Sequence, residues 1–510
     1  MRYYLGLDNG GTATKAAIFD EYGKEIASAG TDTAMLVPRP GFTERDMEEM
    51  WEANCQVIRE ALKKSGLSGR EIASVAVCGH GKGLYLWGKD GRPVRGGIIS
   101  TDNRAWRYPE KWKKDGTEEK VFALSCQHIL ASQPVSLLAW LKENEPGTLE
   151  KTQWIFACKD YVRFRLTGEA YAERTDYSGC NFVNLHTGEY DRELLLLFGL
   201  EECMEKLPPL KLSTDICGYI TEEAAEKTGL AAGTPVAGGA FDIDACALAV
   251  GITDEKHICM IAGTWSINEY IGKAPVTDGS VMMNSYFCLP GYYLIEECSP
   301  TSAGNNAWFV KHLLPELKEE CKKTGQNVYE LMNEWVGEIP AEEFCPVYLP
   351  FLMASNVHPN ALGSFVGISN FHTRKHLVRS VYEGVAFSHR YHLEKLLATR
   401  KEAPESIRLA GGAARSPMWT QMFADVMKLP VESVEVDETG AFGCALIGAA
   451  AVGDCADMEK AVEKMCRISA PVLPNPERLA IYDEKYKLYC ETIQALDGLW
   501  DSIQGYRDRH

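Results

Sequence analysis

Leu5-Gly-Leu-Asp8-Asn-Gly10-Gly11-Thr12-Ala-Thr14-Lys15-Ala-Ala-Ile-Phe-Asp20 is the stretch that decides the fold. Apolar residues lead into it and out of it, and its polar, glycine-containing middle predicts a β-hairpin that reverses between Asp8 and Thr14. Glycines at such a tip let backbone N–H groups approach an anion closely. The pattern therefore predicts either a phosphate site or a glycine-rich turn without a ligand.

The side chains of this hairpin suit a polyphosphate that is bound together with a cation. Thr12 and Thr14 supply hydroxyls, Lys15 can offer a positive charge to a phosphate, and Asp8 can hold a metal ion such as Mg²⁺. The stretch lacks the Gly-x-x-x-x-Gly-Lys-Ser/Thr spacing of a Walker loop. We therefore expect a nucleotide-binding element of a different type.

The composition limits the class of protein. The chain has 510 residues, of which 45% are hydrophobic and 24% charged, which is typical of a globular protein with two or more domains. A net charge of −18 argues against a nucleic-acid partner. The sequence contains no apolar run that could span a bilayer and no signal core, and its 17 cysteines form no Cys-x-x-Cys pair. We expect a cytoplasmic protein with reduced thiols and no membrane partner.

Two loops in the first half carry charged side chains directly after strands. The apolar run 72–78 leads into Gly-His80-Gly-Lys82-Gly, where backbone and side chains could meet a small polar ligand. A second run leads to Asp102 and Arg104, which could bind sugar hydroxyls or form a surface ion pair. The sequence alone leaves both readings of this pair open.

A third strand, at 234–239, leads into Gly-Gly-Ala-Phe-Asp242 and a helix of small residues. An aspartate at this position is either a helix cap or a carboxylate that faces a cleft. Asp244 is expected to be structural.

The second half repeats this plan. Strands at 257–261 and 267–271 enclose a second Gly-Thr turn, at Gly263 and Thr264, which is a weak internal repeat of domain size. A later strand at 407–410 leads into Gly-Gly-Ala-Ala-Arg-Ser-Pro and a helix, where glycine backbone could bind a phosphate or the edge of a nucleoside. We place the domain boundary near residue 250, which gives domains 1–250 and 251–510.

Two stretches make the chain resemble the FGGY carbohydrate kinases of the actin-like ATPase superfamily, over essentially its whole length. Residues 132–144 are similar to the first family signature, with Leu137 where a lysine is usual, and residues 363–383 match the second. The resemblance implies an α/β fold of two actin-like (ribonuclease H-like) ATPase domains, with the active site in the cleft between them. It implies ATP and Mg²⁺ as cofactors, a sugar as substrate and, as one oligomeric state to test, a homodimer.

The resemblance also implies roles for individual residues. It assigns the first phosphate motif to Asp8, Gly10, Gly11, Thr12 and Thr14, the second to Gly263 and Thr264, a further nucleotide contact to Gly304, and the adenosine motif to Gly411, Gly412, Ala413 and Ser416. It assigns sugar binding to His80, Lys82, Asp102, Arg104 and Asp242, with Asp242 as the catalytic base and Asp8 at the metal.

Within the family, the chain most resembles the branch that phosphorylates L-xylulose and 3-keto-L-gulonate. Gly-Lys-Gly at 81–83, Pro-Val-Ser-Leu-Leu-Ala-Trp-Leu-Lys-Glu at 134–143 and Gly-Gly-Ala-Phe-Asp at 238–242 carry this finer match, while His80 stands where glutamine is common. The alternatives are a kinase for D-xylulose, L-ribulose or erythritol, an ATP-binding regulatory protein of the same fold, and an inactive kinase.

Overall fold

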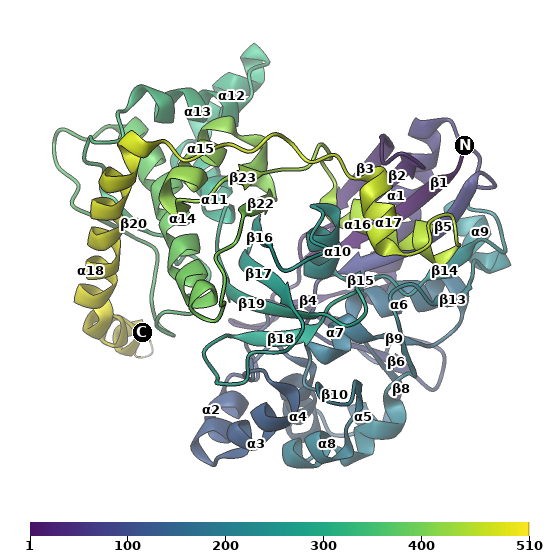
Figure 1. Ribbon diagram of the computed structural model, residues 1–510. Helices are drawn as coiled ribbons and strands as arrows, with labels where there is room; N and C mark the ends of the chain where they lie inside the picture. Colours follow the sequence, from purple (N-terminus) through teal and green to yellow (C-terminus); the bar gives the residue numbers. More distant parts are fainter. Residues whose placement is uncertain (508, 510) are drawn as a thin grey trace. The chain divides into compact units, whose positions relative to one another are not determined.

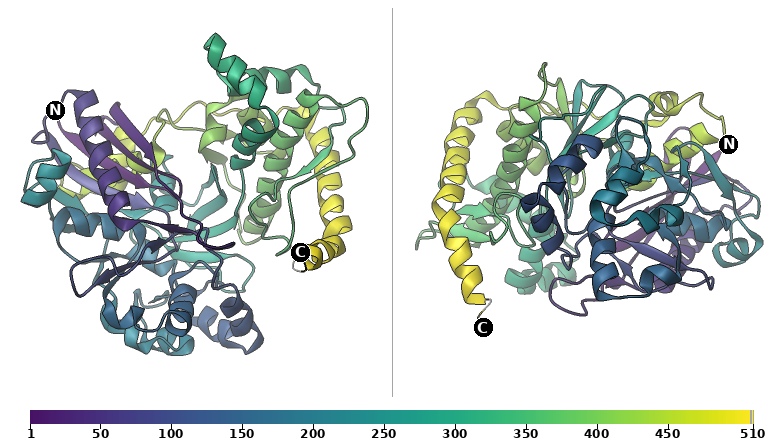
Figure 2. Two further views of the ribbon diagram at one scale, coloured as in Figure 1. Left: turned by 180° about the vertical axis from the view of Figure 1, so that it is seen from behind. Right: turned by 90° about the horizontal axis from the view of Figure 1, so that it is seen from below.

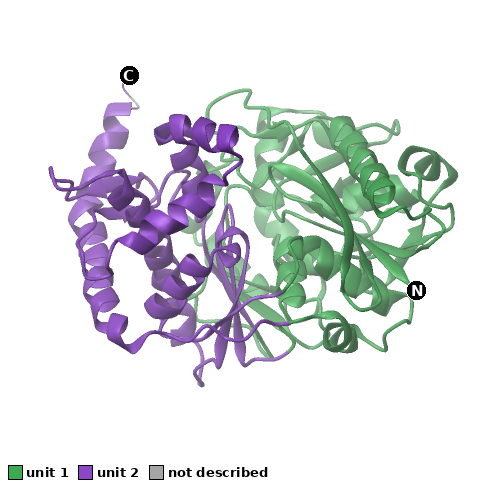
Figure 3. Ribbon diagram, turned by 90° about the horizontal axis from the view of Figure 1, so that it is seen from above, with its two compact units in different colours: residues 1–253, 271–295, 435–467 green, residues 254–270, 296–434, 468–510 purple. Residues whose placement is uncertain are grey.

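The computed structural model describes residues 1–507 and 509, which form an α/β structure with two compact units (Figures 1 and 3). Unit 1 comprises residues 1–253, 271–295 and 435–467, and unit 2 comprises residues 254–270, 296–434 and 468–510. Two segments from the second half of the sequence thus pack with the N-terminal half. The division at residue 250 concerns the sequence domains and stays a prediction.

Unit 1 is built on many strands, several of them only two residues long. These are β1 (Tyr3–Asn9), β2 (Ala13–Asp20), β3 (Glu25–Asp32), β4 (Glu44–Arg45), β5 (Ile72–Gly79), β6 (Tyr85–Gly88), β7 (Gly97–Ile98), β8 (Thr152–Phe156), β9 (Ala172–Glu173), β10 (Val183–Asn184), β11 (Glu189–Tyr190), β12 (Leu210–Lys211), β13 (Ile216–Tyr219), β14 (Pro235–Ala237), β15 (Ala240–Phe241) and β18 (Met283–Tyr286). Its helices are α1 (Met47–Ser65), α2 (Arg107–Lys114), α3 (Thr117–Ser125), α4 (Pro134–Asn144), α5 (Thr148–Lys151), α6 (Cys158–Thr167), α7 (Arg174–Ser178), α8 (Arg192–Phe198), η1 (Glu201–Lys206), α9 (Glu222–Thr228), α10 (Asp242–Ala249), α16 (Thr439–Ala451) and α17 (Met458–Met465).

Unit 2 is richer in long helices. It holds most of β17 (Ser266–Gly272) and β19 (Tyr293–Ser299), together with β16 (His257–Ala262), β20 (Val347–Leu349), β21 (Ser364–Val366), β22 (Ser406–Ala410) and β23 (Val431–Glu432). Its helices are α11 (Gly304–Leu313), α12 (Pro315–Thr324), α13 (Val328–Glu338), α14 (Arg374–Ala398), η2 (Gly412–Arg415), α15 (Pro417–Met427) and α18 (Pro476–Arg507).

The main sheet of unit 1 has the strand order β13-β14-β5-β1-β2-β3, and β15 also pairs with β5. The β1–β2 hairpin is antiparallel, as predicted, whereas β5 runs parallel to β1 and β15 runs parallel to β5. Strands that run parallel end at the same edge of a sheet. The loops that follow β1, β5 and β15 are therefore brought to one edge.

Side-chain alternation along β1 explains how this sheet is covered on both faces. Leu5 and Leu7 belong to the hydrophobic core that includes Trp51 of α1, a helix that Figure 2 shows lying along the strands. Gly6 points the other way, toward α16, and a Cβ atom there would lie 1.9 Å from the Ala441 carbonyl oxygen. The predicted small-residue helix thus exists, and it packs against β1 so closely that only glycine fits.

Unit 2 repeats the arrangement of strands. In the part of its sheet ordered β17-β16-β22-β23, β16 and β17 form an antiparallel hairpin and β22 runs parallel to β16. This is the topology of β1, β2 and β5, so the internal repeat expected from the sequence is present in the structure.

The cysteines are described by their oxidation state, and the helices by their length and apolar character. All 17 cysteines are free thiols, and most of them are buried. Within residues 1–507 and 509, no helix combines the length and the apolar character that a membrane crossing requires.

Candidate functional site

The first candidate site lies at the edge of the unit 1 sheet where β1, β5 and β15 end. Asn9 pairs with Gly79 across β1 and β5, and Phe241 pairs with the same Gly79 across β15 and β5. This pairing brings together the hairpin tip that follows Asn9, the loop that carries His80 and Lys82, and the start of α10 at Asp242. These segments are distant in sequence, and parallel pairing alone makes them neighbours.

The hairpin tip is tighter than the sequence suggested. Asp8 pairs with Lys15 and Asn9 with Thr14, so only residues 10–12 form the turn. Thr14 is buried, and its hydroxyl donates to Asn9 Oδ1 at 3.2 Å. This bond braces the tip from inside the protein and leaves Thr12 as the exposed hydroxyl.

The tip glycines border open space. A Cβ atom on Gly11 would meet nothing within 4 Å, and one on Gly10 would meet only the Ala13 carbonyl oxygen, at 3.5 Å. Neither residue has a positive φ. Because the backbone and the packing do not require glycine at these two positions, close approach of a ligand is the physical reason that remains.

A buried arginine that the sequence analysis missed holds this tip. Arg45 is 1% exposed, and its Nη2 atom donates to the carbonyl oxygens of Gly10, at 3.2 Å, and Gly11, at 2.6 Å. Because Arg45 binds both carbonyl oxygens, the orientation of the two peptide groups at the tip is fixed. No local pattern identifies this role, since Arg45 is far along the chain from the tip.

Asp8 and Asp242 are two carboxylates with raised pKa values, and the charge of Asp8 contributes to the shift of Asp242. Burial raises the pKa of Asp8 to about 6, with Lys15 lowering it and Glu438 raising it further. Burial raises the pKa of Asp242 well above its usual range, and the charges of Asp8 and Asp176 add to this shift. Burial and the neighbouring carboxylates thus disfavour the charged forms of Asp8 and Asp242, and a bound cation would favour them.

Asp242 does not act as a helix cap. It is the first residue of α10, the cap position belongs to Phe241, and no side-chain capping bond is made there. Lys82, whose φ of 62° is unusual for a residue with a side chain, lies with its Nζ 5.5 Å from the centroid of the Phe241 ring. The Lys82 charge lowers the pKa of both Asp242 and Asp176.

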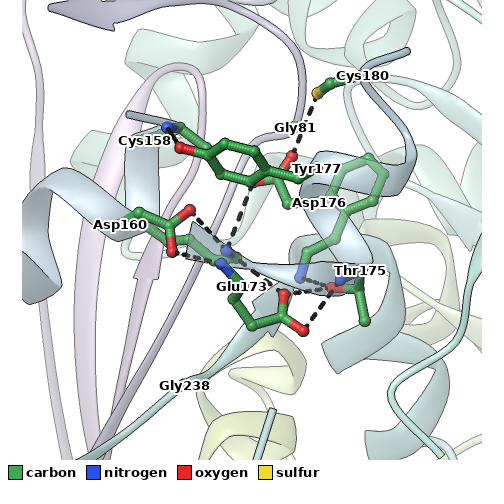
Figure 4. Close-up of polar contacts among 12 residues, drawn as sticks. Gly81, Cys158, Asp160, Glu173, Thr175, Asp176, Tyr177, Cys180 and Gly238 are labelled. Atoms are coloured by element: carbon green, nitrogen blue, oxygen red, sulfur yellow. Dashed lines mark hydrogen bonds and ion pairs between the residues drawn. The ribbon is translucent and has the colours of Figure 1, made fainter. Parts of the chain in front are cut away.

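A buried ionic cluster supports the start of α10 (Figure 4). Lys159 donates to Asp160 at 2.8 Å and forms longer ion pairs with Glu173, at 3.4 Å, and Asp176, at 3.8 Å. Burial raises the pKa of Asp176 to about 7, and its Oδ2 has no hydrogen-bond partner among the described residues. The cluster therefore holds a carboxylate that is only weakly neutralised, close to Asp242.

Thr175 connects this cluster to Asp242. Its hydroxyl donates to Glu173 Oε2 at 2.6 Å and accepts the backbone N–H of Phe241 at 2.9 Å. Phe241 directly precedes Asp242, so these bonds set the position of the aspartate. The sequence analysis assigned no role to Thr175.

His80 is engaged within the protein through both ring nitrogens. Nδ1 lies 3.3 Å from the Gly81 carbonyl oxygen and therefore carries the proton, which leaves Nε2 to accept from the Tyr85 hydroxyl at 2.8 Å. Burial, together with the charge of Arg45, lowers the pKa of His80 to about 3. The neutral ring thus shapes the loop that carries Lys82.

Asp102 and Arg104 do pair with each other, but inside the protein rather than at its surface. Arg104 donates to both Asp102 oxygens and to Glu44 Oε1 at 2.7 Å, and its guanidinium lies 4.3 Å from the centroid of the Phe42 ring. Its Nη1 is buried and has no hydrogen-bond partner among the described residues. That N–H group is the donor of this pair that remains for a ligand.

The second candidate site lies at the matching edge of the unit 2 sheet. Ile261 pairs with Ala410, so the turn at residues 263–264 and the loop at 411–416 leave the sheet side by side. Gly411 has a φ of 85°, and a Cβ atom there would lie 2.6 Å from the Ala262 carbonyl oxygen. Glycine at 411 is thus required for the close contact of these two segments.

The outer glycines of unit 2 border open space, like those of the first hairpin. A Cβ atom on Gly412 would meet nothing within 4 Å, and one on Gly263 would meet only Ile261, at 3.9 Å. Gly304 begins α11 and donates its N–H to the Gly263 carbonyl oxygen at 3.2 Å. Ala413 is fully buried.

Ser416 has a structural role in the same loop. Its hydroxyl accepts the Trp419 N–H at 3.1 Å, which caps α15, and donates to Asn333 Oδ1 at 2.8 Å. The side chain is therefore already engaged within unit 2.

The chain belongs to the FGGY family of carbohydrate kinases. Residues 3–249 match the N-terminal domain of that family and residues 258–452 match its C-terminal domain. The protein is therefore a carbohydrate kinase, and the predicted two-domain kinase fold is confirmed. Kinases of this family use ATP as the phosphoryl donor.

Particular relatives agree over nearly their whole length. A probable L-xylulose kinase of Pasteurella multocida is 36% identical over 505 residues, which cover 98% of this chain and 100% of the relative. The L-xylulose/3-keto-L-gulonate kinase of Escherichia coli is 37% identical over 505 residues, which cover 99% of each chain. The crystal structure of a xylulose kinase from Rhodospirillum rubrum superimposes with a TM-score of 0.84 at 26% identity, covering 98% of this chain and 100% of that one.

Proposed function

We propose that this kinase transfers the γ-phosphoryl group of ATP to a hydroxyl of a ketose, with L-xylulose or 3-keto-L-gulonate as substrate. The similarity of 36–37% to kinases named for these sugars, over 98–99% of the chain, supports the choice. The match at residues 81–83, 134–143 and 238–242 points to the same branch.

Asp242 is the general base of the proposed reaction. The observation that carries this assignment is its position at the sheet edge beside the hairpin tip, free of any capping bond. Phosphoryl transfer needs mainly positioning and charge stabilisation, together with one group that accepts the proton of the attacking hydroxyl. Such a base typically contributes about 10²–10⁴-fold in rate. The raised pKa of Asp242 brings its proton affinity closer to that of a working base at neutral pH.

The residues proposed to bind ATP lie in glycine-rich turns and loops. Gly10, Gly11, Gly263 and Gly412 border open space and let phosphate oxygens approach the backbone closely, and hydroxyls assist them. The residues are Gly10, Gly11, Thr12, Thr14, Gly263, Thr264, Gly304, Gly411, Gly412, Ala413 and Ser416. Thr14 and Ser416 act mainly by bracing the local backbone, because their hydroxyls are already engaged.

Asp8 is the residue that would hold Mg²⁺. Magnesium is usually bound through one or two carboxylates plus substrate phosphates and water. This agrees with the described residues, among which no three His, Cys, Asp or Glu side chains are grouped to hold a metal ion. Burial raises the pKa of Asp8 and of Asp242, and a bound cation would favour the charged carboxylates. When bound at Asp8, Mg²⁺ would offset the negative charge of the ATP phosphates.

Lys82 and Arg104 bind the sugar in this proposal. The Lys82 ammonium is held close to Phe241 and Asp242, and Arg104 offers its remaining N–H, with Asp102 fixing the guanidinium plane. His80 shapes the loop on which Lys82 lies.

A coupled ADP-release assay tests the proposal. The panel contains L-xylulose, 3-keto-L-gulonate, D-xylulose, L-ribulose and erythritol, each with Mg²⁺-ATP. We expect kcat/KM to be highest for one of the first two sugars, and Asp242→Asn to lower kcat at least a hundredfold while ATP affinity stays within a few-fold. Asp244→Asn is the control carboxylate on the same helix.

Other outcomes would redirect the assignment. A higher kcat/KM for D-xylulose, L-ribulose or erythritol would overturn the substrate and leave the kinase class standing. Near-wild-type turnover by Asp242→Asn would overturn the general base. ATP hydrolysis that no sugar stimulates would favour the alternative of an ATP-binding regulatory protein.

A further inference from the structure

A buried hydrogen-bonded relay in unit 2 connects α14 to the second Gly-Thr turn. Ser302 Oγ lies 2.8 Å from His389 Nε2, and His389 Nδ1 lies 2.9 Å from Asn268 Oδ1. All three side chains are completely buried. None of the sequence motifs includes His389, which lies in the middle of α14.

The direction of each hydrogen bond in this relay follows from the orientation of the Asn268 amide. Asn268 Nδ2 donates to the Glu297 carbonyl oxygen at 3.4 Å, which sets the amide so that its Oδ1 faces His389. His389 must then carry its proton on Nδ1, and Nε2 is left as an acceptor for the Ser302 hydroxyl. Burial lowers the pKa of His389 to about 3, with a further lowering from His392, so the ring stays neutral at physiological pH.

The segment that begins at Ser302 is hydrogen-bonded to the turn at residues 263–264. Its backbone N–H donates to the Thr264 carbonyl oxygen at 3.0 Å, and Gly304, two residues later, donates to the Gly263 carbonyl oxygen at 3.2 Å. Both carbonyls of the turn are therefore held by the segment that His389 anchors. The N–H groups of the same two peptide groups, which belong to Thr264 and Trp265, are thereby given a set orientation, whereas the Gly263 N–H donates to the Trp265 carbonyl oxygen at 3.2 Å.

The serine, histidine and amide resemble a hydrolytic triad only in outline. A nucleophile must reach its substrate, whereas this serine is completely buried and its proton is committed to the histidine. The relay therefore fits a role in orientation rather than in chemistry.

We propose that His389 is a positioning residue for ATP, which holds Ser302 so that the turn at residues 263–264 presents the N–H groups of Thr264 and Trp265 to the phosphates. The inference rests on the proposed role of that turn in ATP binding. His389 is expected to affect the nucleotide and not the sugar, because its two side-chain hydrogen bonds lead to Ser302, beside this turn, and to Asn268.

Steady-state kinetics of full-length variants test the inference. His389→Phe removes both hydrogen bonds and is expected to raise KM for ATP about tenfold while KM for the sugar stays within twofold. His389→Gln places an acceptor and a donor about as far apart as the two ring nitrogens, and it should restore KM for ATP to within threefold of wild type. Ser302→Ala, which keeps the backbone N–H but frees the segment, should show the effect of His389→Phe even if the phenylalanine variant folds poorly.

His392→Gln is the matched control. His392 lies three residues further along the same helix, is equally buried, and bonds Glu297 Oε2 at 3.1 Å instead of Ser302. It should cost similar stability without changing KM for ATP. Equal changes in KM for ATP and for the sugar in His389→Phe, or no change in Ser302→Ala, would overturn the inference.

Gly263→Ala separates the inference from the function on which it rests. Its Cβ would enter the open space beside the turn, so KM for ATP should rise if the turn binds ATP. An unchanged KM in this variant would remove the turn from the ATP site. A raised KM here with unchanged His389→Phe and Ser302→Ala would overturn only the relay.

Discussion

Lys15 Nζ lies 2.8 Å from Glu438 Oε2, which joins the first hairpin to the segment that leads into α16. The two residues are 423 positions apart in the sequence. This ion pair gives Lys15 a partner within the protein, so its predicted role as a phosphate contact competes with a structural one.

Lys15→Met distinguishes these two roles. Because Glu438 already occupies the ammonium group, we expect KM for ATP to change less than threefold and stability to fall by about 0–1 kcal/mol, the usual value of a partly exposed ion pair. Steady-state kinetics and thermal unfolding measure the two effects. A tenfold or larger rise in KM for ATP would return Lys15 to the phosphate site.

Gly11→Ala tests whether the open space at the hairpin tip belongs to the nucleotide. The new methyl group meets nothing in the protein, so the free energy of unfolding should change by less than about 0.5 kcal/mol. KM for ATP should nevertheless rise about tenfold, because the methyl group occupies the space of a phosphate. Gly6→Ala provides the contrast, since overpacking against Ala441 should cost about 1–3 kcal/mol or more. Unchanged ATP binding in Gly11→Ala would argue for a turn without a ligand.

Thr175→Val tests the connection between the buried cluster and Asp242. Valine has a similar volume but cannot accept the Phe241 N–H, so the base should lose its set position. We expect kcat to fall about ten- to a hundredfold with KM for ATP nearly unchanged. Thr228→Val is the control, since Thr228 is equally buried and also accepts a backbone N–H, from Leu230 at 3.2 Å. If both variants lose kcat equally, Thr175 has no special role.

Asp176 makes the stability of the fold depend on pH. Burial raises its folded-state pKa to about 7 from 3.8, so the folded protein binds this proton more tightly than the unfolded chain does. The resulting contribution is fully present below pH 3.8 and is lost as the pH rises through 7. Asp176→Asn has no proton to lose, so between pH 5 and pH 8 it should lose roughly 1–3 kcal/mol less stability than the wild type.

Denaturant unfolding of both proteins at the two pH values measures this difference. Asp160→Asn is the comparison, because Asp160 is the closest partner of Lys159, at 2.8 Å, and its loss should destabilise the fold at both pH values. Parallel pH profiles for wild type and Asp176→Asn would contradict the raised pKa.

The sequence predicted best those features that depend on the local backbone. A hairpin with two tip glycines, a strand that ends in Gly-Gly, and an aspartate at the start of a small-residue helix are patterns of neighbouring residues, and each element has its expected type in the structure. The two family signatures extended this local reading to the whole chain.

The sequence did not predict which polar side chains are hydrogen-bonded or ion-paired within the protein. His80, Lys15 and Ser416 looked like ligands because polar residues stood in glycine-rich loops, yet each has partners within the protein. Arg45 and Thr175 had no local signal, although they hold the tip and the start of α10. Whether a polar group is available to a ligand depends on which distant segments of the chain pack against it.

By itself, the sequence determined the kinase family, the two repeated strand-turn units and the position of the candidate aspartates, because these follow from hydrophobic period, turn chemistry and signature motifs. Only the tertiary structure decided that α16 returns to unit 1 and that three loops meet at one sheet edge. The physical reason is that parallel pairing and close helix packing, as at Gly6, join residues hundreds of positions apart. No local pattern encodes which segments those will be.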